Sequence, residues 1–163
     1  MTTRYKVHCR PSFHPEMEIE VLFEDEGELI RVQSEGRTAQ APLSVAQGVA
    51  FLEAMEALAP DSIANGWEGG IDGCFFTCSV QNARGAVHTF SAWNPQPGRS
   101  PSQYAFISLV HGLAVDTIRE PVTANLLKQL GATSRTRRPA PRPSPRPRPP
   151  LPGTRSPGAR RSS

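Results

Sequence analysis

The sequence predicts an α+β fold, in which an antiparallel sheet carries helices packed on one face as a two-layer sandwich. Apolar and polar residues alternate in several short runs, which is the period of a half-buried strand. Short turns join neighbouring runs, which favours hairpins over helical crossovers. Two longer apolar segments open with helix start signals. We expect the element order β-β-β-α-β-β-α-α.

The first forty residues read as an antiparallel meander. Residues 4–10 and 17–23 alternate clearly, and residues 29–33 return after a turn at Asp25-Glu26-Gly27. In the second run the apolar side chains are Met17, Ile19, Val21 and Phe23, and the acids facing the other way are Glu18, Glu20 and Glu24. A further short strand is expected near Thr38–Ala41.

The first helix is expected to begin at Ser44, where Gln47 completes a capping box. Pro60 ends it, because the proline ring disfavours helical backbone at the preceding residue. Its predicted apolar stripe consists of Val45, Val49, Leu52, Met55 and Ala59, widened by Phe51 and Leu58.

Two further strands, 74–81 and 86–93, form a hairpin around the loop 82–85. If the loop has these four residues, Gln81 pairs with Ala86. Ser79 then lies opposite His88, on the same face of the hairpin.

The second helix is expected to start at Ser100, with Pro101 in the first helical position and Gln103 completing another capping box. Residues 104–118 are apolar almost all round, so this helix should be central and buried. Pro121 interrupts it. A short last helix carries Val122, Leu126, Leu127 and Leu130 and ends at Gly131.

The charge distribution divides the chain into two parts. The net charge of the 163 residues is +3, but residues 131–163 contain nine Arg, nine Pro and no Lys or acid. Residues 1–130 therefore carry a net charge of −6. We expect an acidic globular domain over 1–130 and a disordered, extended Arg/Pro-rich tail over 131–163, since the tail has too few apolar residues to form a core.

No motif for a metal or a cofactor is present, and we expect none to be bound. The three cysteines are read as packed core thiols, because Cys74 and Cys78 lie ~13 Å apart along one strand; Cys9 can also meet one of them across strands. His14-Pro15-Glu16 lacks the cysteine motif of zinc deaminases. The glycine-rich loop 66–73 lacks the spacing and lysine of a phosphate loop.

Catalysis has one candidate, the cross-strand pair Ser79 and His88, in which a nucleophile lies next to a base. No acid is predicted beside it, so a hydrogen bond on the sheet surface is the simpler interpretation. His111 lies on the apolar stripe of the second helix, and we expect it to be partly buried and hydrogen-bonded.

Protein binding has better candidates. Trp67 and Trp93 flank polar loops, and large aromatics with a polar edge are typical interface anchors. Glu18, Glu20, Glu24 and Asp25 belong to an acidic run over residues 16–28 that can attract a basic partner, or the chain's own tail. The alternatives are tryptophans that cover the core and a solvated sheet face.

The tail offers two specific interpretations. Arg146, Pro149 and Pro152 fit R-x-x-P-x-x-P, the form of a polyproline ligand. Arg142, Arg146, Arg148 and the other arginines can instead bind a polyanion such as nucleic acid without sequence specificity. An extension with no selected role is the third interpretation.

Three hypotheses for function follow, in this order: a non-enzymatic protein-interaction module, sharpest as an inhibitor- or immunity-type binder of a basic enzyme; a nucleic-acid-associated protein acting through its tail; and a small enzyme with an unrecognised site. The start of the chain lacks the apolar run of a secretory signal. No stretch is long enough to span a bilayer. With sparse cysteines, these features favour a cytoplasmic protein that does not bind membranes.

Overall fold

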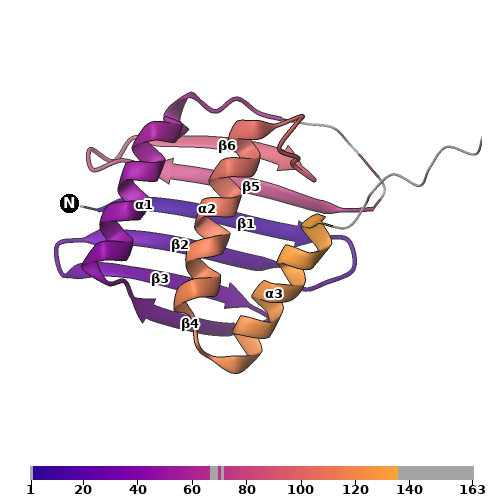
Figure 1. Ribbon diagram of the computed structural model, residues 1–163, viewed down its shortest axis with the longest axis horizontal. Coiled ribbons are helices and arrows are strands. Elements are labelled where there is room, and N and C mark those ends of the chain that lie inside the picture. The colour runs from indigo at the N-terminus through magenta and orange to yellow at the C-terminus, as the bar shows by residue number, and fades with distance from the viewer. Residues whose placement is uncertain (1, 67–69, 71, 136–163) are drawn as a thin grey trace, which may run out of the picture.

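A six-stranded antiparallel sheet, in the order β4-β3-β2-β1-β5-β6, forms one layer of the protein (Figure 1). The computed structural model describes residues 2–66, 70 and 72–135. Its strands are β1 (Thr3–Pro11), β2 (Met17–Glu24), β3 (Gly27–Ser34), β4 (Arg37–Pro42), β5 (Cys74–Gln81) and β6 (Val87–Trp93). Four strands thus precede the first helix. The short strand expected near Thr38–Ala41, which the expected order did not count, is present as β4.

Three helices cover one face of this sheet (Figure 1). They are α1 (Val45–Leu58), α2 (Pro101–Thr117) and α3 (Pro121–Arg135), and a single 3₁₀ turn, η1 (Pro60–Ser62), follows α1. The predicted α+β sandwich is confirmed, with α2 lying between the other two helices. The largest fully buried side chains include Phe76, Phe90, Phe106, Ile19, Leu22, Ile30 and Met55. Within the described residues, no helix is both long and apolar enough to cross a membrane.

The capping box is confirmed at the first helix and wrong at the second. The backbone N–H of Gln47 donates to Ser44 Oγ, and the Gln47 amide oxygen accepts from the Ser44 N–H. Ser100 makes no side-chain cap, because its hydroxyl accepts from the Gln96 N–H at 3.0 Å. The Gln103 side chain is buried and donates to the carbonyl of Ala64 at 2.8 Å.

The buried side of α1 is rotated from the predicted stripe. Gly48, Phe51 and Met55 are buried, whereas Val45, Val49 and Leu52 are exposed. Phe51 takes the core-facing position because it stacks on Phe23 and meets the Tyr5 ring edge-on. The predicted apolar stripe therefore lies mostly outside the core.

The register of the β5–β6 hairpin is also one residue away from the expected one. Gln81 pairs with Val87, not with Ala86. Asn82 donates from its N–H to the carbonyl of Ala86, and Gly85 adopts a φ of +82° inside the resulting three-residue loop. A three-residue loop of this kind is a common alternative to the four-residue one.

The last helix continues past its predicted end. Gly131 was expected to stop it, but α3 runs through this residue to Arg135. A Cβ added at Gly131 would lie only 3.0 Å from the His111 ring. The glycine therefore allows α3 to pack closely against His111 and does not end the helix. The predicted disordered tail over 131–163 falls almost wholly outside the described residues.

Candidate functional site

The outer side of α1 presents apolar side chains in a line. Val45, Val49 and Leu52 are 80%, 49% and 37% exposed, and their spacing places them on one side of the helix. Glu56 continues the same line one turn later. Exposed apolar side chains that lie side by side make this part of α1 a candidate contact surface.

This stripe leads into a groove between α1 and the sheet. The groove has a volume of about 380 Å³, and its walls include Tyr5 on β1, Leu52 and Glu56 on α1, and Asp61 on η1. Burial, and secondarily the negative charge of Asp61, raises the pKa of the Tyr5 hydroxyl, so this phenol stays neutral and can hydrogen-bond a ligand.

Acidic residues surround the stripe. α1 contains Glu53 and Glu56 and no Lys, Arg or His. The β2–β3 turn carries Glu24, Asp25 and Glu26, all exposed. Phe23, next to Glu24, stacks on Phe51 of α1 with ring centroids 6.1 Å apart, and this contact holds the turn beside the helix. We call Val45, Val49, Leu52, Glu53, Glu56 and the turn residues 24–26 the α1 surface.

Two predicted partner-binding residues, Glu18 and Glu20, lie elsewhere. They are on the face of the sheet that the helices leave open, where β1 supplies basic neighbours. Glu18 contacts Lys6 at 2.9 Å, and Glu20 lies 3.5–3.8 Å from Arg4, Lys6 and Arg31. The carboxylates of Glu18 and Glu20 are therefore paired with basic side chains of the sheet, and Glu20 is also buried.

Trp93 and the β2–β3 turn lie at opposite ends of the strands. Trp93 pairs with Phe75, which in turn lies opposite Arg10, and the Arg10 guanidinium sits 5.0 Å from the Phe75 ring centroid. Trp93 is half-buried. Trp67 and the tail residues Arg142, Arg146, Arg148, Pro149 and Pro152 lie outside the described residues, so the proposed roles of these six positions stay predictions.

The predicted pair of Ser79 and His88 does not form. With the shifted register, His88 lies opposite Val80, and Ser79 is on the other face of the sheet. The His88 ring contacts the carbonyl of Ile63 at 2.9 Å and packs on Phe90. The expectation for His111 is confirmed: it is half-buried, and its Nε2 donates to the carbonyl of Leu127 at 2.8 Å.

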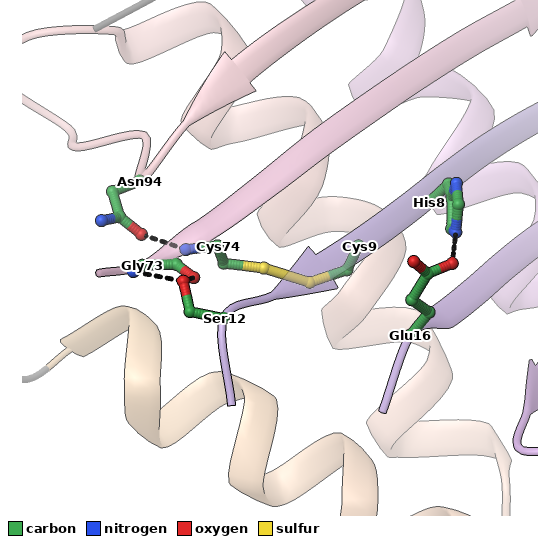
Figure 2. The surroundings of a disulfide bond; sticks show 7 residues. All are labelled: His8, Cys9, Ser12, Glu16, Gly73, Cys74 and Asn94. Carbon is green, nitrogen blue, oxygen red and sulfur yellow. Dashed lines mark hydrogen bonds and ion pairs between the residues drawn. A yellow bond between two sulfur atoms is a disulfide. The ribbon is translucent and has the colours of Figure 1, made fainter. Parts of the chain in front are cut away.

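The expectation of packed thiols holds only for Cys78. Cys9 and Cys74 form a disulfide between β1 and β5, and their Cα atoms are 6.4 Å apart (Figure 2). Because Cys9 lies opposite Phe76 and Cys74 opposite Pro11, the two cysteines are diagonal neighbours on the helix-covered face. The alternative that Cys9 meets one of the other cysteines across strands is the arrangement observed. The sequence did not identify its partner, since the adjacency of β1 and β5 was unknown. Disulfides are typical of oxidising compartments, so the cysteines no longer favour a cytoplasmic location.

The surroundings of the disulfide are structural. The Asn94 side-chain oxygen accepts from the Cys74 N–H at 2.7 Å (Figure 2). The Ser12 hydroxyl accepts from the Gly73 N–H and donates to the Gly73 carbonyl. His8 Nε2 lies 3.2 Å from a Glu16 carboxylate oxygen on the open side of β1. Across the part of the chain that the structure describes, no three His, Cys, Asp or Glu side chains gather as metal ligands would.

No protein-family model matches the chain, and no curated protein sequence matches it either.

Proposed function

We propose that this protein is a non-enzymatic protein-interaction module that binds a basic partner through the α1 surface. The single observation that supports this most is the exposed line Val45, Val49 and Leu52 on a helix whose buried residues are Gly48, Phe51 and Met55. Apolar side chains in such a line gain free energy when a partner removes them from water.

The charge around the line indicates the kind of partner. Negative charge comes from Glu53, Glu56 and the β2–β3 turn. Neither α1 nor this turn contains a Lys, Arg or His. An apolar centre with a charged rim is the usual anatomy of a protein interface. A rim of one sign accelerates association with a partner of opposite sign. An inhibitor of a basic enzyme is the sharpest form of this proposal.

The competing hypotheses have less support. The one nucleophile–base pair named for the enzyme hypothesis, Ser79 and His88, lies on opposite faces of the sheet. A small enzyme with an unrecognised site stays an alternative. The nucleic-acid hypothesis rests on the nine arginines of the tail alone. It stays a second proposal, and the experiment below separates it from the first.

The test is capture of partners from a lysate of the cell that makes the protein. The bait is the full-length chain as wild type, as the double variant Val45→Ser with Val49→Ser, and as Val122→Ser. Val122 is a matched control, since it is also an exposed helical valine (44%) but lies on α3. Bound proteins are identified by mass spectrometry at low and moderate salt, and bound nucleic acid is measured in parallel.

We expect one protein with a basic surface to be retained by the wild type and by Val122→Ser, and to be lost, by about tenfold or more, with the double variant. Retention should weaken as the salt concentration rises. If all three baits retain the same protein equally, the α1 surface is not the interface. If they retain only nucleic acid, the tail hypothesis replaces this one.

A further inference from the structure

A second cavity lies on the same side of the sheet, far along α2 from the α1 surface. It has a volume of about 510 Å³ and lies between α2, α3 and the start of β5. Its apolar walls are Phe76, Ile107, Val115 and Leu130. The volume and the apolar lining are typical of sites for small organic ligands.

The α2 wall of the cavity lacks a side chain at one position, Gly112. Gly112 lies in the middle of the helix, and a Cβ at this position would meet no atom within 4 Å. Glycine inside a helix costs about 1 kcal/mol relative to alanine. The side of α2 that carries Gly112 also carries Tyr104, Ser108 and Val115. This side of the helix lines the cavity.

The polar groups of the cavity point to the charge of its ligand. Tyr104 and Ser108 bring hydroxyls, and the His111 ring is held by its hydrogen bond to the carbonyl of Leu127. Among the described residues of the lining, Lys128 is the one with a full charge, and there is no Asp or Glu. The chain's own Arg-rich tail would bring charge of the same sign as Lys128.

We propose that this cavity binds a small amphipathic monocarboxylate. The apolar body of the ligand packs against Phe76, Ile107 and Val115, and its carboxylate lies at the mouth, where Lys128 supplies the opposite charge and the hydroxyls of Tyr104 and Ser108 can donate hydrogen bonds. This inference is independent of the α1 surface, because none of these residues belongs to that surface.

The test measures binding of three ten-carbon probes to the full-length protein by titration calorimetry. Decanoate, decanol and decylamine share one apolar body and differ in the charge of the head group. We expect decanoate to bind about tenfold more tightly than decylamine, with decanol between them.

Two pairs of variants locate the site. Gly112→Leu fills the cavity and should abolish decanoate binding, whereas Ala50→Leu adds the same side chain to an exposed position of α1 and should leave binding unchanged. Lys128→Gln should weaken decanoate binding by about two- to fivefold, a size set by the exposure of Lys128, and leave decanol unaffected. Arg119→Gln removes the same charge outside the cavity and should have no effect.

The proposal is wrong if the wild type binds none of the probes, or if Gly112→Leu, folded by circular dichroism, binds decanoate as the wild type does. It is also wrong if decanoate and decylamine bind equally and Lys128→Gln changes neither. The comparison of decanoate with decylamine and the Lys128→Gln variant need no substitution in the core. They therefore test the proposal even if Gly112→Leu does not fold.

Discussion

At the scale of single residues, the Cys78 thiol is an example of a group whose burial has a measurable consequence. It lies in the middle of β5, next to Phe90 in the register, and is completely buried. Desolvation raises its pKa strongly, because the thiolate would lose its hydration. The thiol is therefore unreactive at neutral pH, in contrast to the exposed, low-pKa cysteines that act as nucleophiles.

This burial predicts loss of stability in alkaline solution. Below about pH 9, the thiol is protonated in both the native and the unfolded states. Above that pH the unfolded state releases the proton and the native state retains it, so the free energy of unfolding falls as pH rises. Between pH 8 and pH 10, the wild type should lose about 1 kcal/mol more than Cys78→Ala, as measured by urea denaturation. Equal losses in the two proteins would show that Cys78 does not titrate in this way.

At the scale of elements, the β5–β6 hairpin shows how one turn residue sets the side chains of two strands. Gly85 adopts a φ of +82°, and the Asn82 side chain accepts from the N–H groups of Arg84 and Ala86. This geometry places Gln81 opposite Val87 and not opposite Ala86, a shift of one residue along β6. A shift of one residue moves every side chain of the partner strand to the other face, which is why Ser79 and His88 separate.

Replacing the turn glycine should therefore destabilise the protein. A side chain at positive φ costs about 1 kcal/mol, because its Cβ clashes with the backbone. Gly85→Ala should lower the free energy of unfolding by this amount, and Gly85→Asn by less, since asparagine tolerates the left-handed region. Thermal unfolding of the two variants and the wild type measures both effects. An alanine variant as stable as the wild type would contradict the turn geometry.

The elements were predictable where the signal is local. The alternation over residues 17–23 and the Ser44–Gln47 capping box each need only a few neighbouring residues, and both are confirmed. The buried side of α1 was predicted only in part: Phe51 and Met55 are in the core, whereas Val45, Val49 and Leu52 face outward. An apolar pattern does not distinguish a core contact from a partner contact. That error is also the signal from which the α1 surface could have been found.

At the scale of the whole molecule, the order of the strands determines which distant residues meet. β1 lies between β2 and β5, so it joins the first meander to the second hairpin. The Cys9–Cys74 disulfide links β1 to β5 across 65 residues of sequence. Neither the strand order nor this bond could be predicted from local patterns, because both depend on contacts between segments far apart in the chain.

Loss of the disulfide should have a large effect on stability. Without the bond, the unfolded chain gains the conformational entropy of an open loop of this length, which lowers the free energy of unfolding by about 4 kcal/mol in the chain-entropy model. The variant Cys9→Ser with Cys74→Ser should unfold at correspondingly lower urea concentration, and a reducing agent should bring the wild type to a similar midpoint. Cys78→Ala is the control and should remain sensitive to reduction. A wild-type midpoint that reduction does not change would contradict the predicted contribution.

The proposal that the α1 surface binds a basic protein is tested most directly by amide hydrogen exchange of the full-length chain with and without its captured partner. We predict that binding slows exchange over residues 45–58 and 24–27 and leaves the exchange rates of the β5 and β6 amides unchanged. Protection on β5 and β6, with none on α1, would contradict the proposal and move the interface to the opposite face of the sheet.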